Sequence, residues 1–345
     1  MARCRLWHRH HHRGFQRIMT TTLLLLLGGF ILLIAGGELL VRGAVRIAAW
    51  AGMSPMLVGL TVVALGTSSP ELAASLQASL AGAPGIAIGN IVGSNMANLL
   101  LILGASALIA PMAVEGRTLW RDGGVGVLAV VAMIVAGYTL GLDRFVGAAF
   151  LLATALYIAH AYRQEMRGAT HGAAYDKAMA AEEADPALIP PEAPQGSLLA
   201  ALGVALAGLV LIVGGGKLLV DNAVELAGIL GISDTVIGLT VVAVGTSLPE
   251  LVTSVIAALR KHSDIAIGNV LGSNIFNFLF IGGTTGLIAP TAIPETILRL
   301  DLWLVLGASL LVMLFAYTGG RLGRREGATL LSAYILYTGV TVALN

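Results

Sequence analysis

Charged residues are scarce in this chain of 345 residues, at 11% against about 25% in an average soluble domain. So few charges exclude an ordinary soluble domain. The formal net charge of +1 gives no signal of nucleic-acid binding. Cys4 is the single cysteine, which excludes an intrachain disulfide bond.

What the chain has instead is apolar sequence. Apolar residues make up 57% of it, and the mean hydropathy is +0.88. Apolar stretches of about 20 residues recur, and each is long enough to cross a hydrocarbon core of about 30 Å. The 44 glycines fit closely packed and interrupted membrane helices. The composition therefore predicts an all-α polytopic membrane protein that lies in a lipid bilayer.

The chain contains nearly the same segment twice. Residues 59–111 and 238–290 align without a gap at a constant offset of 179 residues, and 31 of the 53 paired positions are identical. Each copy places a single carboxylate, Glu71 or Glu250, inside an otherwise apolar stretch. A duplicated apolar segment with one acid per copy indicates a two-fold-related cation site inside a membrane.

The apolar segments predict ten transmembrane helices in two repeats of five, with broken helices at the site. The predicted helices are 22–48, 55–80, 86–110, 120–140 and 144–163 in the first repeat (22–163), and 197–227, 234–259, 265–289, 296–317 and 327–344 in the second (197–345).

Two segments lie outside the predicted helices. Residues 1–21, which include the run HRHHHR, are expected to be a disordered extension, with Met19 as the functional initiator. A signal peptide and a metal-binding His tract are the alternatives. Residues 164–196 carry four prolines and an acidic run, which predicts a polar linker too short for a folded regulatory domain.

An odd number of helices per repeat requires the second repeat to enter the membrane from the opposite side. Arg42 and Arg46, at the end of the first helix, correspond to Asp221 and Glu225 at the 179-residue offset. Such a charge inversion is what the positive-inside rule demands of an inverted repeat. If the first helix begins outside, twelve Lys and Arg residues, Lys177 among them, lie on the cytoplasmic side and three outside. The linker is then cytoplasmic.

The motif GTS-x-PE occurs once in each repeat, at 66–71 and 245–250. A proline in a membrane helix lacks an N–H, and its ring displaces the carbonyl four residues earlier, so each motif predicts a helix break. Irregular backbone at this depth is tolerated only where it is buried or lines a wet cavity. Each break gathers backbone carbonyls, the hydroxyls of the motif and one carboxylate.

A second motif, G-N-x-x-G-S-N-x-x-N, follows each break. Ser94 and Asn98 are four residues apart and can share a helix face, as can Ser273 and Asn277. The combined set contains oxygen ligands without His or Cys, which suits a hard cation such as Ca²⁺ or Na⁺. Both a site role and a helix–helix packing role remain open for the other motif asparagines, which are Asn90, Asn95, Asn269 and Asn274. Glu38 is expected to be a structural acid, and Lys217 is a candidate partner for it.

These motifs resemble a known family. GTSSPE with GNIVGSNMAN, and GTSLPE with GNVLGSNIFN, are similar to the two α-repeats of the sodium/calcium exchanger family within the calcium/cation antiporter superfamily, most of all to its compact prokaryotic members. The resemblance covers about 22–344. It implies an antiporter that exchanges Na⁺ for Ca²⁺ across the cytoplasmic membrane by alternating access, with no cofactor and no obligatory protein partner. Carried over by motif position, the implied ligands are the carbonyls of Ala64 and Ala243 and the side chains of Thr67, Ser68, Glu71, Ser94, Asn98, Thr246, Ser247, Glu250, Ser273 and Asn277.

Departures from the family pattern bear on ion coupling. Some members carry Asp where this chain has Asn277, which argues against K⁺ cotransport. Proton-coupled members tend to carry Glu where this chain has Gly93 and Gly272, which argues against H⁺ coupling. Ser69, opposite Leu248 of the second copy, is expected to be a packing difference. No GxxxxGK motif followed by Ser or Thr occurs, so an ion gradient rather than ATP must drive transport, and the chain is not expected to be an enzyme. A cation/H⁺ antiporter and a passive cation channel are the alternatives.

Overall fold

A computed structural model describes the backbone of residues 2–53, 61–62, 64–114, 119–166, 173–189 and 196–343. It describes their side chains from residue 18 onward, except 119, 165 and 166. The first repeat comprises α1 (Ala2–Trp50), α3 (Ala64–Gly66), α4 (Ser69–Leu80), α5 (Pro84–Met96), η2 (Ala97–Ile102), α6 (Leu103–Ile109), β1 (Met112–Ala113), η3 (Leu119–Gly123), α8 (Gly124–Thr139) and α9 (Arg144–Met166). The linker holds α10 (Ala173–Ala184) and η4 (Pro186–Leu188).

The described helices of the first repeat recur in the same order in the second, but the second repeat has its strand just before its last helix, whereas β1 follows α6. It comprises α11 (Leu198–Leu230), α12 (Asp234–Ile237), η5 (Gly238–Val242), α13 (Ala243–Thr246), α14 (Leu248–Leu259), α15 (Ser263–Phe276), η6 (Asn277–Ile281), α16 (Gly282–Ile288), η7 (Ile297–Asp301), α17 (Leu302–Gly319), β2 (Arg321–Leu322) and α18 (Arg324–Ala343). β1 pairs antiparallel with β2, and Leu142 forms a bridge with Thr291.

The described residues include seven helical stretches long and apolar enough to cross a membrane. An eighth is added if the pair Asp234–Thr246 and Leu248–Leu259, bent by 48°, counts as one span. The predicted helix 55–80 is described only in part, because 54–60 and 63 lie outside the described residues. The helices confirm the predicted all-α polytopic membrane fold, with a broken helix in the second repeat.

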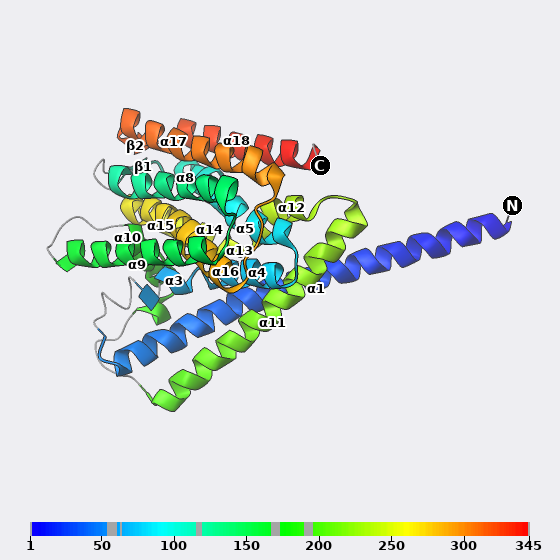
Figure 1. Cartoon of the computed structure of the whole chain (residues 1–345), viewed down its shortest axis with the longest axis horizontal. Helices are drawn as coiled ribbons and strands as arrows, with labels where there is room; N and C mark the ends of the chain where they lie inside the picture. The colour runs from blue at the N-terminus through cyan, green and yellow to red at the C-terminus, as the bar shows by residue number, and fades with distance from the viewer. Residues whose placement is uncertain are drawn as a thin grey trace.

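The repeat-related helices α1 and α11 pack lengthwise in opposite directions (Figure 1). A Cβ atom on Gly29 would lie 2.8 Å from the backbone nitrogen of Leu219, and one on Gly36 would lie 2.8 Å from that of Ile212. Contacts thus move backward along α11 as they move forward along α1. The two α11 glycines 179 residues further on approach the α1 backbone equally closely. The repeats are therefore inverted, and small residues bring their first helices together.

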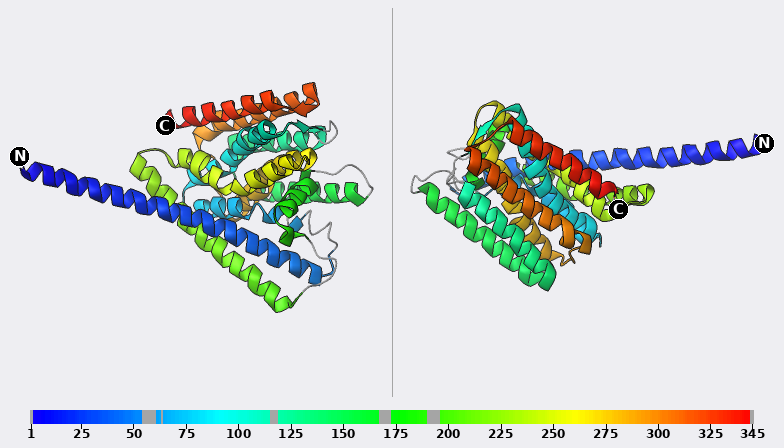
Figure 2. Two further views of the ribbon diagram at one scale, coloured as in Figure 1. Left: turned by 180° about the vertical axis from the view of Figure 1, so that it is seen from behind. Right: turned by 90° about the horizontal axis from the view of Figure 1, so that it is seen from above.

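Further contacts between the repeats enclose the centre of the molecule. α18 packs on α6, and its counterpart α9 packs on α16. Gly104 approaches Gly327 at the first contact, and Gly283 approaches Gly147 at the second. α8 and α17 pack against each other (Figure 2). The stretches 84–109 and 263–288, which carry the second motif, are the most buried of the seven candidate membrane spans and form the core around the site.

The N-terminal segment differs from the expectation. Residues 1–21 were predicted to be a disordered extension, whereas α1 is helical from Ala2 and continues without a break into the apolar run. This part of the helix stands clear of the other helices (Figure 2). No proline interrupts the segment, so a helix nucleated in the apolar run can extend outward one hydrogen bond at a time.

The linker also differs from the expectation. Its stretch AAYDKAMAAEEA is rich in alanine and contains neither glycine nor proline, a composition that favours helix. It forms α10, which packs against α14 and α15. Asp176 and Lys177 are buried in this helix, together with most of its alanines. The prediction of an unpacked polar linker is therefore wrong for 173–184.

Candidate cation site

A change of backbone direction marks both GTS-x-PE motifs. Ser68 and the repeat-related Ser247 have nearly the same conformation, with φ −87° and ψ 11° in the first and φ −87° and ψ 9° in the second. A proline lies in the first turn of α4 and of α14, where its missing N–H costs no helical hydrogen bond. Glu71 and Glu250 follow in the same first turns, where the helix dipole favours a carboxylate.

The two glutamates meet at the centre of the protein. Glu71 is 2% exposed and Glu250 is 3% exposed, and the two are near enough to interact electrostatically. Ser247 Oγ donates to Glu71 Oε1 over 3.4 Å, so the break of one repeat contacts the carboxylate of the other. The two acids of the duplicated motif therefore lie near each other in the fold.

Two motif asparagines position the glutamates. Asn90 Nδ2 donates to the Glu71 carbonyl over 3.1 Å, and Asn269 Nδ2 donates to the Glu250 carbonyl over 3.2 Å. Each amide also donates, over 2.8 Å, to a serine hydroxyl one turn further along the glutamate helix. These bonds lock the turn that carries each carboxylate, which assigns both asparagines to the scaffold of the site.

The hydroxyls and carbonyls at the breaks are bonded to one another. Thr67 Oγ1 donates to the Ala64 carbonyl over 3.2 Å, and Thr246 Oγ1 approaches the Ala243 carbonyl at 3.3 Å. Ser94 Oγ lies 3.5 Å from the same Ala243 carbonyl. The second motif of the first repeat therefore reaches the break of the second repeat.

Asn98 and Asn277 lie where the core helices widen into π turns. Asn277 is the first residue of η6, and Asn98 is the second residue of η2. Both side chains are buried. π turns inside α-helices often occur at functional sites, because the extra residue turns a side chain toward the site. Asn98 Nδ2 donates to Asn274 Oδ1 over 3.0 Å, which leaves its own carbonyl oxygen for another partner.

Several of these oxygens fit a hard cation. Four buried site oxygens have no hydrogen-bond partner in the described part of the chain, and these are Ser68 Oγ, Glu71 Oε2, Asn98 Oδ1 and Glu250 Oε2. Ca²⁺ takes six to eight oxygen ligands, and carboxylate, amide and hydroxyl oxygens all serve. Over the described residues, His, Cys, Asp and Glu side chains gather in no group of three or more. A site with two carboxylates and otherwise neutral oxygens can both bind and release a cation.

Ser69 has a role that sequence comparison missed. Its hydroxyl donates to the Gly66 carbonyl, which is the carbonyl that Pro70 displaces from helical hydrogen bonding. The second repeat has Leu248 at this position, which offers no hydroxyl. The difference is therefore a hydrogen bond to a freed carbonyl and not only a change in packing.

Lys177 is the site residue that sequence reasoning did not find. It is 1% exposed, and its Nζ lies 3.1 Å from Glu250 Oε1 and 2.6 Å from Ser273 Oγ. Its position in the linker predicted a cation on the cytoplasmic side. The one available signal was the alanine-rich stretch around it, whose small side chains permit close burial.

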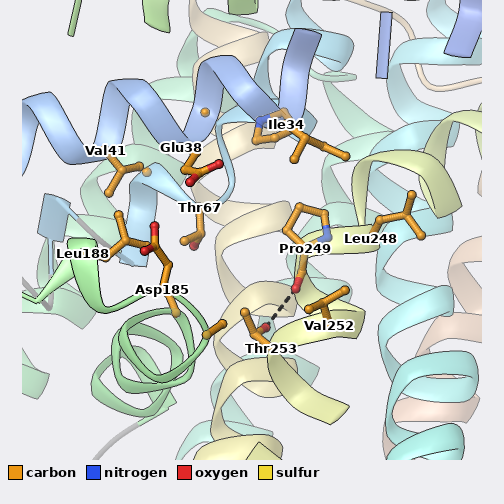
Figure 3. A pocket seen from close by; sticks show the side chains of 15 residues that line it. Ile34, Glu38, Val41, Thr67, Asp185, Leu188, Leu248, Pro249, Val252 and Thr253 are labelled. Carbon is orange, nitrogen blue, oxygen red and sulfur yellow. Dashed lines mark hydrogen bonds between the residues drawn. The ribbon is translucent and has the colours of Figure 1, made fainter. Parts of the chain in front are cut away.

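A cavity of about 270 Å³ lies between α1, α10 and α14, beside the site (Figure 3). Thr67 lies on its wall, and Glu38 and Asp185 contribute carboxylates to the lining. Arg42 pairs with Glu38 and also with Asp185, over 2.8 Å in the second case. Glu38 thus has the partner expected of a structural acid, but that partner is Arg42. Lys217 pairs instead with Asp221 on its own helix.

The two inverted repeats, with an acid at the break of each, define an ion-exchange protein. A family model described as "Sodium/calcium exchanger protein" matches residues 21–163 and 200–343. The chain belongs to this family. The two matched segments coincide with the two repeats and leave out the whole linker 164–196, and α10 with it.

Individual relatives agree with this assignment. The chain is 36% identical over 303 residues to the putative antiporter CaxA of Alkalimonas amylolytica, which covers 87% of this chain and 92% of the relative. It is 36% identical over 325 residues to the sodium/calcium exchanger MaX1 of Methanosarcina acetivorans, covering 88% and 93%. A solved structure of the sodium-calcium exchanger NCX_Mj, soaked with Na⁺ and Sr²⁺, superposes with a TM-score of 0.58. It has 33% identity and covers 91% of this chain and 96% of that one.

Proposed function

We propose that this chain exchanges Na⁺ for Ca²⁺ across the cytoplasmic membrane and so extrudes Ca²⁺. The observation that carries the proposal is the pair of repeat-related glutamates, both buried and each with an oxygen that lacks a partner within the described residues. Membership of the exchanger family, and relatives named as an antiporter and a sodium/calcium exchanger, support the same function.

The proposed ligands come from both breaks and both second motifs. They are the carbonyls of Ala64 and Ala243, the hydroxyls of Thr67, Ser68, Ser94, Thr246, Ser247 and Ser273, the amides of Asn98 and Asn277, and the carboxylates of Glu71 and Glu250. Eleven of the twelve residues are buried, and Thr67 is half-buried at the cavity. No protein nitrogen is needed in this ligand set, which favours Na⁺ and Ca²⁺ over softer metals.

Exchange follows from competition for the same charge. Two carboxylates balance one Ca²⁺, and the same carboxylates attract Na⁺ when Ca²⁺ has left. Occupancy by one ion excludes the other, so each change of access carries one kind of ion across. Inverted repeats provide two related arrangements that open the shared site to opposite sides in turn.

The Na⁺ gradient sets the direction of transport, because an antiporter can run either way across the membrane. An inward Na⁺ gradient therefore drives Ca²⁺ outward. The asymmetry of Lys and Arg, eleven to three once the buried Lys177 is left out, supports a cytoplasmic linker 164–196. The proposed location is the cell membrane, with no cofactor and no obligatory protein partner.

The test is Ca²⁺ uptake into everted membrane vesicles with and without an opposing Na⁺ gradient. Uptake that depends on Na⁺ loaded inside the vesicles is the expected result. Uptake that persists without Na⁺ and follows a pH gradient would instead show a cation/H⁺ antiporter. A Ca²⁺ conductance without any counter-ion would show a channel.

A further inference from the structure

The hydrogen bonds of the site do not follow the repeat symmetry. Ser247 of the second repeat donates to Glu71 of the first, so symmetry calls for Ser68 to contact Glu250. Ser68 Oγ is instead buried without a partner in the described residues, and Glu250 Oε1 accepts a hydrogen bond from Lys177. One cation from the linker therefore replaces a contact that the repeats would make between themselves.

The same replacement occurs at the second motif. Ser94 approaches the Ala243 carbonyl, so symmetry calls for Ser273 to approach the Ala64 carbonyl. Ser273 Oγ instead accepts from Lys177 Nζ over 2.6 Å. Lys177 thus occupies the space beside the second repeat's ligands that the helix break of the first repeat would occupy in a symmetric arrangement.

α10 lies in the groove on α15 that the helix break of the first repeat would occupy if the two repeats packed symmetrically. On α5, Gly89 and Gly93 are overlaid by η5 and α13, and a Cβ on Gly89 would lie 2.9 Å from the Leu239 nitrogen. On α15, the related Gly268 is overlaid by Asp176, and a Cβ on Gly272 would lie 2.7 Å from the Ala173 carbonyl oxygen. The repeat-related occupant of the α15 groove is the segment 59–67, of which 59, 60 and 63 lie outside the described residues.

Both ends of α10 are fastened to membrane helices. At its start, the buried Asp122 accepts the Ala173 N–H at Oδ2 over 2.9 Å. At its end, Asp185 pairs with Arg42 of α1 over 2.8 Å. Glu183 is in contact with His262, at the start of α15. A helix fastened in this way holds the lysine at a fixed depth.

We propose that Lys177 is a tethered cation that competes with Ca²⁺ at Glu250 and Ser273, and that α10 is an inhibitory helix which must leave its groove before the site can load. The inference rests on the proposed exchange function. Undocking would free the α15 groove for the break of the first repeat, which would bring Ser68 to Glu250 and restore the symmetric site.

Geometry makes the competition exclusive. A Ca²⁺ ion lies about 2.3–2.6 Å from its oxygen ligands. The ammonium nitrogen already lies 2.6 Å from Ser273 Oγ and 3.1 Å from Glu250 Oε1, so the two cations would overlap. The lysine also cancels one of the two carboxylate charges that a divalent ion needs. Docked α10 and bound Ca²⁺ therefore cannot coexist at these ligands.

The first test compares Ca²⁺ uptake by everted vesicles that carry Lys177→Gln with uptake by the unchanged protein. A site blocked nine-tenths of the time has its apparent affinity lowered about tenfold, so Lys177→Gln should lower the half-saturating Ca²⁺ by about tenfold or more. Lys217→Gln is the matched control, because its lysine is 71% exposed and pairs with Asp221 away from the site. It should behave as the unchanged protein does.

A second variant guards against a folding defect in Lys177→Gln. Asp185→Asn removes the fastening of α10 to α1 and leaves Lys177 and all proposed ligands unaltered. Because this ion pair is partly exposed, the half-saturating Ca²⁺ should fall by about two- to fivefold. An active unchanged protein, with half-saturation unaltered or raised in both variants, would overturn the inference.

A labelling measurement reports whether α10 is docked and does not depend on transport. Ala178, 1% exposed on α10, is replaced by cysteine in a Cys4→Ser background, and exposed Ala187 serves as the reference position. An impermeant maleimide should label Ala178→Cys slowly and Ala187→Cys rapidly in Ca²⁺-free everted vesicles. Added Ca²⁺, or the further change Lys177→Gln, should speed the labelling of Ala178→Cys.

The uptake and labelling measurements distinguish a failure of the inhibitory-helix proposal from a failure of the proposed exchange function. Labelling of Ala178→Cys that is fast from the start, or that Ca²⁺ leaves unaltered, overturns the inhibitory helix even if exchange occurs. Absence of Ca²⁺ uptake in every variant overturns the exchange function, and the competition with it. Uptake that appears only in Lys177→Gln and Asp185→Asn supports both.

Discussion

Glu71 and Glu250 should respond differently to neutralisation, although the sequence makes them equivalent. Glu71→Gln and Glu250→Gln each remove half of the carboxylate charge of the site, and both should abolish Na⁺-driven Ca²⁺ flux without unfolding the protein. Only Glu250 is paired with Lys177, so only Glu250→Gln should also release α10.

The size of the difference follows from the ion pair. Two unit charges 3.1 Å apart attract by about 5 kcal/mol at an effective dielectric constant of about 20. Removing one partner of a buried pair costs about 3–5 kcal/mol, because the other charge stays buried without compensation. Glu71 lies near enough to Lys177 to compensate part of that charge, which favours the lower value. About 3 kcal/mol shifts the docking equilibrium by about a hundredfold.

The assay is maleimide labelling of Ala178→Cys in Ca²⁺-free everted vesicles, with the rate for Ala187→Cys as the upper limit. Glu250→Gln should raise the rate of Ala178→Cys labelling toward that limit, and Glu71→Gln should leave it slow. Equal rates in the two glutamine variants would refute the assignment of Lys177 to Glu250. Near-normal Ca²⁺ flux in either variant would refute the proposed ligands.

Three further outcomes are expected. Exchange should not require K⁺, because Asn98 and Asn277 add no further carboxylate, and loss of flux on removing K⁺ from both sides of sealed vesicles would contradict this. Ala187→Cys should react with an impermeant maleimide from the cytoplasmic side only, and reaction in intact cells would reverse the orientation. Burial raises the pKa of Glu182 on α10 from 4.5 to about 7. The docked helix therefore favours neutral Glu182. The contribution of Glu182 to docking is fully present below about pH 4.5 and is lost as the pH rises through about 7. Labelling of Ala178→Cys should speed up over this range, and Glu182→Gln should remove the pH dependence.

Local chemistry made much of the site predictable. Pro70 and Pro249 cannot continue a helix whatever surrounds them, so the breaks follow from the motif alone. A repeat that places one acid beside each break predicts the meeting of Glu71 and Glu250, because duplicated membrane segments pack about a common axis. The inversion was also predictable, since an odd number of helices per repeat, five in the prediction, reverses the direction of the second.

The missing parts depend on contacts between distant segments. Lys177 is 73 residues from Glu250 in the chain, and the composition of its linker argues for solvation. All four prolines of the linker lie after α10, so its average composition hides an alanine-rich helix. The hydrogen bond from the Ser69 hydroxyl to the Gly66 carbonyl was not predicted, because the difference between this serine and the repeat-related leucine was interpreted as a difference in packing.

The α15 groove has a consequence for how inhibition by a linker helix could evolve. Gly268 and Gly272 are copies of Gly89 and Gly93, so duplication alone accounts for a groove that can receive a helix. A linker that gained a short alanine-rich helix with one lysine could occupy this groove without any change in the glycine motifs that form it. Inhibition of this kind can be acquired or discarded largely through the loop, and grafting 164–196 onto an uninhibited exchanger that has counterparts of Asp122, Arg42 and His262 should carry the trait with it.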